Sequence, residues 1–392
     1  MKELSKIKND FPQLKEGKHY LDSAASSLTP LQVLDAVDAY YKDHRANIHR
    51  GLYEESVAAS AAYDATRENV AKLIGAKKDE VIFTSGSTGS ANMLVRMIEG
   101  SRTWNAGDRI VTTVLEHHGA LVPLQEFAKR NGLVIDYIDP ATCTQLDGVK
   151  LLSIMAVSNV LGTKQPVASL AALAHAQGAL VICDATAAVG HTPIDVVSLG
   201  VDALWFSGHK ILGPTGVGVL WVKQELLDTL SPALFGGDMV ERVTKEGATW
   251  VSGPERFEAG TPNISGVIGL GCAVDYLMQV GIEEIERHTA TLAFRAHRAL
   301  EQLPGVHVIS PCDPTKNVGI VSFVVDGVHA HDMGQILADH GVAVRAGHHC
   351  AMPLHKHLGI GATTRASFYL YNDERDIDAL VEGVKKAQQI FS

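Results

Sequence analysis

The sequence predicts an α/β protein: a large domain with a mostly parallel seven-stranded sheet covered by helices, and a smaller α/β C-terminal domain. Three observations support this fold. Short, nearly all-apolar runs alternate with helical segments through the first two-thirds of the chain, as in strands buried on both faces. The pattern changes after about Gly266. The chain has 392 residues and is 46% hydrophobic, which is enough for one large core and a second, smaller one.

Seven strands and several helices are expected in the first part of the chain. The strands are Glu80–Ser85, Arg109–Val114, Leu133–Ile138, Lys150–Ser158, Ala179–Thr186, Ala203–Ser207 and Val217–Val222. Helical segments such as Gly119–Arg130 and Val167–Gln177 lie between them. Because ligands of such sheets bind beyond the carboxyl ends of the strands, polar residues at those ends are the first candidates for a site.

The last third of the chain predicts a second arrangement of helices and strands. A long helix is expected over Ile282–Leu303, followed by a strand over Val318–Val325 and a helix near Asp332–His340. Strands over Val342–Gly347 and Thr364–Tyr371 and a final helix complete it. We therefore place a large domain at residues 16–265 and a small domain at residues 266–392, which the N-terminal segment 1–15 joins.

Composition and charge exclude several classes of protein. The net charge of −10 disfavours a nucleic-acid or anionic-membrane partner, because both require a basic surface. No apolar run approaches the length of a membrane span, and the N-terminus has no apolar signal core. The cysteines are odd in number, scattered and without a C-x-x-C pair, which favours a reducing cytoplasm over a disulfide framework. They are Cys143, Cys183, Cys272, Cys312 and Cys350.

Two strand ends carry charged residues in apolar surroundings. Lys210 follows a strand in "FSGHKILGPTGVG", and Asp184 lies near the end of the strand "ALVICDAT". A lysine in an apolar region can have a lowered pKa and act as an amine nucleophile, although a surface lysine on a turn is the simpler alternative. Pyridoxal phosphate needs a lysine for its Schiff base, an acid for its pyridinium nitrogen and a cradle for its phosphate.

A phosphate cradle is available in "TSGSTGSAN" (Thr84–Asn92). Glycines and small hydroxyl residues, among them Ser87 and Thr88, follow a strand and open a helix, so backbone N–H groups can bind an anion. The next strand is followed by "EHHGALVP", which puts His117 where a ring can stack on a planar cofactor. Taken alone, each signal is equally typical of a turn or a structural histidine.

The stretch "RAGHHCAMPLHKHLG" (Arg345–Gly359) leaves three interpretations of Cys350 open. The thiol is a nucleophile, with Arg345, His348 and His349 favouring the thiolate. Alternatively it is a zinc ligand beside the neighbouring histidines, or a packed small hydrophobe. Adjacent His-His-Cys side chains project in different directions and lack standard ligand spacing, which disfavours the metal site.

Taken together, these motifs resemble those of a known family over almost the whole length of the chain. It is similar to fold-type I pyridoxal-phosphate enzymes of the class V aminotransferase group, and more narrowly to the Suf-type (group II) cysteine desulfurases and selenocysteine lyases. The motifs that carry the resemblance are "YLDSAASS", "NIHRG", "EHH", "VSNVLGT", "SGHK", "GPTG", "RFEAGTPN", "GHHCAMP" and "RASFYLYN".

The resemblance implies a role for each residue that matches a family motif. Lys210 would carry the cofactor, Asp184 would bind its pyridine nitrogen, and His117 would stack on its ring. Asn159 would lie near the phenolic oxygen and the substrate. The phosphate would be held by Ser87, Thr88, Ser207 and His209, together with Thr261 from the second subunit of a homodimer.

The resemblance also implies a reaction. Arg365 would bind the carboxylate of L-cysteine, with Arg345 nearby, and Cys350 would take the sulfur as a persulfide while L-alanine is released. The sulfur would then pass to an acceptor protein of Suf type, for iron–sulfur clusters or other sulfur metabolism. The alternatives are a selenocysteine lyase, a cysteine sulfoxide or other C–S lyase, and a degenerate scaffold in a sulfur-transfer complex.

Two departures from the family pattern bear on these expectations. Ala187 stands where members usually have a glutamine that bonds the phenolic oxygen, so that hydrogen bond has to come from elsewhere. The connection over residues 139–149 is also shorter than usual, because relatives have a further helix there.

Overall fold

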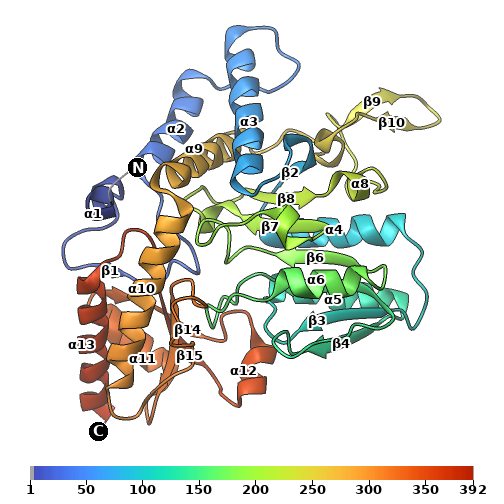
Figure 1. Ribbon diagram of the computed structural model, residues 1–392. Coiled ribbons are helices and arrows are strands. Elements are labelled where there is room, and N and C mark those ends of the chain that lie inside the picture. Colours follow the sequence, from blue (N-terminus) through green and yellow to red (C-terminus); the bar gives the residue numbers. More distant parts are fainter. Residues whose placement is uncertain (1–3, 392) are drawn as a thin grey trace.

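The computed structural model describes residues 4–391, and its largest feature is a seven-stranded sheet (Figure 1). All strands run in one direction except β8, which is antiparallel to both of its neighbours. The predicted mostly parallel sheet is therefore confirmed. Its spatial order is β2 (Val81–Thr84), β8 (Gly218–Val222), β7 (Ala203–Ser207), β6 (Leu180–Asp184), β5 (Val149–Met155), β3 (Arg109–Thr113) and β4 (Val134–Ile138).

Apolar side chains cover both faces of this sheet, because successive residues of a strand point to opposite sides. In β6, Val181 and Cys183 belong to one core and Ile182 belongs to the other. The first core includes residues of α2 (Leu31–Asp43), α3 (Glu54–Leu73), α6 (Val167–His175), α7 (Val196–Leu199) and α9 (Ile264–Val280). The second includes residues of α4 (Ser87–Ser101), α5 (His118–Asn131) and α8 (Gln224–Leu227).

A smaller antiparallel sheet lies beside the large one, in orange and red in Figure 1. Its order is β11 (Val306–Val308), β12 (Ile320–Val325), β15 (Thr363–Ser367) and β14 (Arg345–Gly347). A third core joins it to α10 (Ile282–Glu301), α11 (Ala330–Asp339) and α13 (Glu374–Phe391). The N-terminal strand β1 (His19–Tyr20) pairs in parallel with β13 (Val342–Ala343), which brings the start of the chain to this unit.

The structure corrects two predicted strands of the second part. The strand expected over Val342–Gly347 is divided, because β13 pairs with β1 whereas β14 pairs with β15. The strand expected over Thr364–Tyr371 ends at Ser367. Beyond it the chain turns, and the Tyr369 amide donates to the side chain of Asn372 at 2.8 Å.

Helix α9 was not predicted, and its packing bears on the domain boundary. It begins at Ile264, where the large domain was expected to end, and it contacts α2 and α3. The boundary at residues 265–266 stays a prediction. Residues 1–3 of the predicted segment 1–15 lie outside the described residues. The remaining α-helices and strands are α1 (Leu4–Ile7), α12 (Met352–Leu358) and the hairpin of β9 (Val240–Val243) and β10 (Ala248–Trp250).

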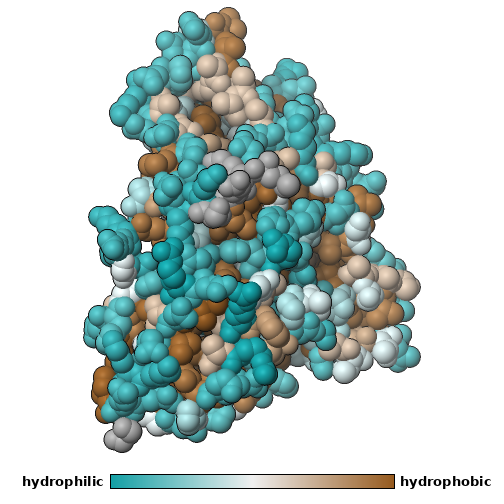
Figure 2. Space-filling model, turned by 60° about the vertical axis from the view of Figure 1, so that its left-hand side comes forward, coloured by the Kyte–Doolittle hydropathy of each residue, from teal (hydrophilic) through white to brown (hydrophobic). Residues whose placement is uncertain are grey.

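The surface seen in Figure 2 is mostly hydrophilic, with separate hydrophobic patches. Large apolar side chains are exposed around the start of α3, among them Leu52, Tyr53 and Val57. Among residues 4–391, no single helix is long and apolar enough to cross a membrane. Only α9 and α10 taken together meet the length and composition, and they are bent by 76° relative to each other.

Candidate functional site

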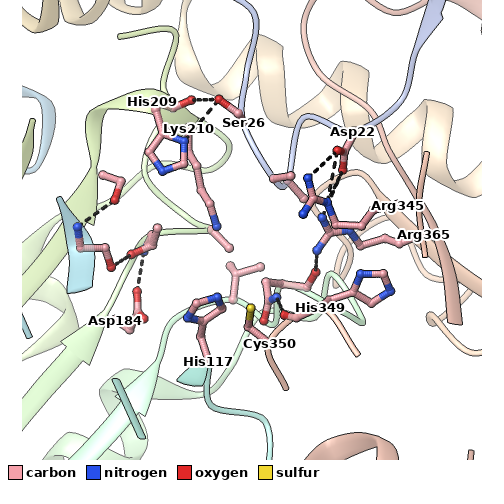
Figure 3. A pocket seen from close by; sticks show the side chains of 18 of the residues that line it. Asp22, Ser26, His117, Asp184, His209, Lys210, Arg345, His349, Cys350 and Arg365 are labelled. Atoms are coloured by element: carbon pink, nitrogen blue, oxygen red, sulfur yellow. Dashed lines mark hydrogen bonds and ion pairs between the residues drawn. The ribbon is translucent and has the colours of Figure 1, made fainter. Parts of the chain in front are cut away.

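A cavity of about 300 Å³ lies at the carboxyl ends of β6 and β7, where the large sheet faces the small one. Figure 3 shows Lys210 reaching toward its middle, with Asp184 on one side and Arg345, Arg365 and Cys350 on the other. Every site residue predicted from the sequence lines this cavity except Thr261. Those that do are Ser87, Thr88, His117, Asn159, Asp184, Ser207, His209, Lys210, Arg345, Cys350 and Arg365.

Asp184 is placed by the central strand β6, whose five residues are all buried. Its Oδ1 accepts a hydrogen bond from the Thr186 amide at 2.9 Å, which fixes the carboxylate at the cavity wall. The apolar residues of β6 fold the strand into the sheet, and the acid at its end therefore sits where water is scarce. A carboxylate in such a place strongly favours a cationic partner.

Lys210 follows β7 in a single turn of 3-10 helix. Burial and the nearby charge of Arg365 lower the pKa of Lys210 to about 8, while Asp184 opposes that effect. A lysine with this pKa is neutral far more often near neutral pH than an ordinary lysine is. Its amine can therefore act as a nucleophile and as a proton acceptor.

The start of α4 forms an end of the cavity rich in hydrogen-bond donors. The Ser87 amide donates to Ser207 Oγ at 2.8 Å, and Ser87 Oγ lies 2.7 Å from Thr186 Oγ1. Gly86 precedes the helix with a φ of 138°, a conformation that side chains disfavour. Thr88 lies in the first turn, where amides and the helix dipole favour a phosphate.

His209 lines the same cavity, one residue before Lys210. Its Nδ1 is 3.3 Å from Ser26 Oγ, and that hydroxyl donates to the backbone oxygen of His209 at 3.2 Å. These bonds tie the turn that carries Lys210 to the N-terminal segment.

His117 caps the start of α5. Its Nδ1 accepts the Gly119 amide at 2.9 Å, so in the neutral ring the proton is on Nε2. Burial and the charge of Lys210 lower the pKa of His117 to about 4. The ring is therefore neutral near pH 7, and it can donate from Nε2.

Two arginines share one carboxylate on the small-sheet side. Arg345 of β14 and Arg365 of β15 are directly opposite each other across the strand pair. Asp22 lies between them, with one oxygen 3.1 Å from Arg345 Nη2 and the other 3.4 Å from Arg365 Nη2. Like charges in opposite positions repel, and the Asp22 carboxylate offsets that repulsion. The guanidinium of Arg365 is almost fully buried, with 2% of its side chain exposed.

Asn159 connects Arg365 to the Cys350 loop, which we define as residues 347–352. Its backbone oxygen accepts from Arg365 Nη1 at 2.8 Å, and its Nδ2 donates to the His349 oxygen at 2.7 Å. Its Oδ1 is buried and has no hydrogen-bond partner among the described residues, although Asn159 lines the cavity. This oxygen is available to a donor on a bound molecule.

Cys350 is exposed on a strained loop. His349 and Cys350 have φ values of 49° and 57°, in the left-handed region that costs a residue with a side chain about 1–2 kcal/mol. The expectation that His349 favours a thiolate is wrong, because burial and Arg365 lower its pKa to about 2 and keep it neutral. Within the described part of the chain, no three His, Cys, Asp or Glu side chains are grouped so as to hold a metal ion.

Thr261 lies outside the cavity of its own chain. It is exposed, in the segment between Phe257 and the start of α9. Its predicted role in a neighbouring subunit stays a prediction.

Two acids are absent from the predicted site: Asp22, which lines the cavity, and Glu116, which precedes His117. Asp22 belongs to the motif "YLDSAASS". Its partners Arg345 and Arg365 are more than 300 positions away in the chain, so the local sequence gives no sign of these ion pairs. Glu116 is 1% exposed, and its Oε1 accepts from Thr113 Oγ1 at 2.8 Å and from the Met155 amide at 3.1 Å. Burial raises the pKa of Glu116 to about 8. The sequence does contain a signal for Glu116, because it is an acid that stands directly before His117 at the end of an apolar strand.

The cavity fits pyridoxal phosphate in its chemistry. Asp184 would bind the pyridine nitrogen, Lys210 would form the covalent bond, and His117 would face the ring. Ser87, Thr88, Ser207 and His209 would hold the phosphate. Asn159 Oδ1, a buried oxygen without a partner, would take a donor from the cofactor or the substrate. When bound, this cofactor acts as an electron sink that weakens the bonds to Cα of an amino acid and supports cleavage at Cβ.

Comparisons with known proteins agree with this geometry. The family model described as "Aminotransferase class-V" matches residues 19–380. A protein of Mycobacterium leprae named "Probable cysteine desulfurase 2" is 43% identical, covering 99% of this chain and 97% of its own. An apo cysteine desulfurase structure from Thermococcus onnurineus has a TM-score of 0.94 and 39% identity, covering 99% of both chains. The structure of the cysteine desulfurase CsdA from Escherichia coli, in an S-sulfonic acid form, has a TM-score of 0.91 and 37% identity over 100% of both chains.

Proposed function

The chain belongs to the class-V aminotransferase family as a pyridoxal-phosphate-dependent cysteine desulfurase, and we propose that Cys350 takes the sulfur of L-cysteine as a persulfide. One observation carries the proposal: an amine nucleophile, a carboxylate-binding guanidinium and an exposed thiol line the same cavity. They are Lys210, Arg365 and Cys350. An aminotransferase needs the first two but has no use for a thiol at this position.

Each of these residues has a separate task in the proposed reaction. Arg365 binds the substrate carboxylate, because a planar guanidinium matches its two oxygens. Nζ of Lys210 takes the proton from Cα, for which its lowered pKa suits it. The neutral ring of His117 can donate a hydrogen bond from Nε2 at the cavity wall.

With Cys350 as the sulfur acceptor, every bond, electron pair and proton of the sulfur-transfer step is accounted for. Its thiolate attacks the substrate sulfur, so that an S–S bond forms while the bond between Cβ and sulfur breaks. The electron pair of that bond stays with the carbon fragment, which gains a proton at Cβ and leaves as L-alanine. The protein keeps one added sulfur atom as a persulfide.

The amino acid formed from L-cysteine by cofactor-loaded protein tests this function. With a reductant present, we expect L-alanine from the wild-type protein. Pyruvate in its place would contradict the proposal and identify an elimination lyase of the same cofactor class. L-selenocysteine in a parallel reaction distinguishes a selenocysteine lyase, which would make alanine from it much faster than from L-cysteine.

We also propose a homodimer, in which Thr261 serves the cofactor site of the partner subunit. The exposed apolar side chains around the start of α3 support an interface there. Dilution or a substitution such as Leu52→Glu is then expected to release cofactor as the dimer dissociates. A monomer that keeps its cofactor would contradict this assembly.

We further propose that the persulfide passes to a Suf-type acceptor protein in the cytoplasm, for iron–sulfur cluster assembly or other sulfur metabolism. An exposed Cys350 supports transfer between proteins, and a reducing compartment keeps its thiol available. Incubation of persulfidated protein with a candidate acceptor should move the sulfur atom to an acceptor cysteine. Sulfide release at the same rate with and without acceptor would contradict the transfer.

A further inference from the structure

The Cys350 loop adopts a conformation that its own residues do not favour. His349 and Cys350 are consecutive left-handed residues, and neither is a glycine or an asparagine. Such a backbone persists only where surrounding contacts hold it. The contacts that hold this loop are therefore informative about how Cys350 is presented to the cavity.

The oxygen of each left-handed residue is bound by a different partner. The His349 oxygen accepts from Asn159 Nδ2 at 2.7 Å, and the Cys350 oxygen accepts from the His118 amide at 2.8 Å. The His118 amide is at the start of α5, where the helix itself offers no acceptor. Cys350 thus supplies the acceptor that the first turn of α5 lacks.

His118 also binds the other end of the loop through its ring. Its Nε2 accepts from the Met352 amide, the first of α12, at 3.1 Å. Burial lowers the pKa of His118, which keeps the ring neutral and Nε2 able to accept. His118 does not line the cavity, whereas its neighbour His117 does.

We propose that His118 and Asn159 are positioning residues that fasten the Cys350 loop to the two walls of the cavity and hold its thiol in place for the substrate. The inference rests on the proposed function of Cys350. Asn159 fastens the loop to Arg365, which binds the carboxylate, and His118 fastens it to the helix start that carries His117. These contacts keep the Cys350 thiol at a fixed position relative to Arg365 and His117, between which the substrate would bind.

Matched variants at His118 separate this role from a general structural one. His118→Phe keeps a ring but removes the acceptor for the Met352 amide, whereas the side-chain oxygen of His118→Gln restores an acceptor. Asn159→Asp removes the donor to His349 with almost no change in size. Hydrogen–deuterium exchange of the holoenzyme peptide containing residues 347–352 reports loop opening directly. The peptide containing β7 reports whether the fold is intact.

In His118→Phe and Asn159→Asp, we expect exchange in the loop peptide to rise by about tenfold, as the loss of one hydrogen bond allows. The β7 peptide should not change. For alanine formation, His118→Phe should lower kcat by several-fold and leave KM within about twofold, because His118 does not touch the substrate site. His118→Gln should return both exchange and kcat most of the way to wild type.

Unchanged loop exchange in His118→Phe would overturn the proposal, as would equal behaviour of His118→Phe and His118→Gln. Faster exchange with an unaltered kcat would overturn it too, because the loop would then be held for no catalytic purpose. A wild-type protein that makes no alanine would refute the proposed function, and the exchange comparison would still decide whether the two residues hold the loop.

Discussion

On the large-sheet wall of the cavity the functional residues lie at the ends of buried strands, whereas on the small-sheet wall they lie on two strands and a strained loop that are tied by ion pairs and hydrogen bonds to distant segments. Asp184 is the last residue of β6 and Lys210 follows β7, and the residues of both strands are buried. Arg345, Arg365 and Cys350 depend on Asp22 and Asn159, which come from distant parts of the chain. The strands of the first wall are held by apolar packing, and the second wall is held in addition by polar contacts between distant segments.

This difference assigns different tasks to the two walls. A planar cofactor that stays bound through many reactions needs fixed partners, and packed strands provide them. A substrate that enters and leaves, and a thiol that passes sulfur onward, need groups that can exchange partners. Substitution of Lys210 on the first wall should remove the covalent bond to the cofactor, substitution of Arg365 on the second should weaken substrate binding, and substitution of Cys350 should stop sulfur transfer while the cofactor stays bound.

The largest effect is expected from Lys210→Ala on the large-sheet wall. Without the amine there is neither a covalent bond to the cofactor nor a base for Cα, so alanine formation should fall by about 1,000-fold or more. Absorbance after gel filtration and an alanine assay measure the two losses. Lys223→Ala, at an exposed lysine beyond β8, is the matched control and should behave as wild type. Activity and bound cofactor near the wild-type level in Lys210→Ala would refute the assignment.

A smaller effect is expected from Arg365→Lys on the small-sheet wall. Lysine keeps the charge but cannot bind a carboxylate through two parallel hydrogen bonds. We expect KM for L-cysteine to rise by about 10- to 100-fold, with kcat less affected. Arg345→Lys is the control, because the side chain of Arg345 is 51% exposed and so contributes less. A larger KM increase in Arg345→Lys than in Arg365→Lys would reverse the roles of the two arginines.

Glu116→Gln should change the pH dependence of stability. Because burial raises the pKa of Glu116 to about 8 from its ordinary 4.5, the folded state holds a proton that the unfolded state loses. The stabilisation is complete below about pH 4.5 and is lost as the pH rises through about 8, at most about 5 kcal/mol in total. Glutamine has no such loss. Melting temperatures between pH 5 and 8.5 should therefore fall more steeply in wild type than in Glu116→Gln, and parallel profiles would contradict this account.

The smallest effect is expected from Thr261→Val, which removes a hydroxyl without changing the size of the side chain. If Thr261 contributes one hydrogen bond to the phosphate in the partner subunit, cofactor affinity should fall by about tenfold or less. Titration of the apoprotein with cofactor measures it. An affinity equal to wild type would remove Thr261 from the site, while loss of the dimer would assign it a role in the interface.

The sequence predicted residues of both walls, but the contacts that hold the small-sheet wall together do not follow from local patterns. Asp184 and Ser207 end two apolar strands and Lys210 comes shortly after the second, so their meeting at one edge follows from a local pattern and from the direction of the strands. The contacts of Asp22 with Arg365 and of Asn159 with His349 depend on how distant segments pack. The division of the expected strand Val342–Gly347 has the same origin, because the pairing of β1 with β13 is not encoded locally.

Similar reasoning explains the error at His349 and the omission of Glu116. A histidine beside a cysteine looks like a cation in sequence, but burial makes His349 neutral. Glu116 is buried and accepts a hydrogen bond from the Met155 amide of the neighbouring strand β5, a contact between strands that its own segment does not encode. The titration of both groups is set by their surroundings in the fold.

The most direct test of the central claim is a single reaction of the holoenzyme with one equivalent of L-cysteine and no reductant, followed by mass analysis of its cysteine peptides. Wild-type protein should gain one sulfur atom on the peptide that contains Cys350, together with one alanine per sulfur. Cys312→Ser, at another exposed cysteine, should give the same result. Cys350→Ser should bind the cofactor but form neither product. Alanine formed at the wild-type rate by Cys350→Ser, or sulfur found on a different cysteine, would contradict the account.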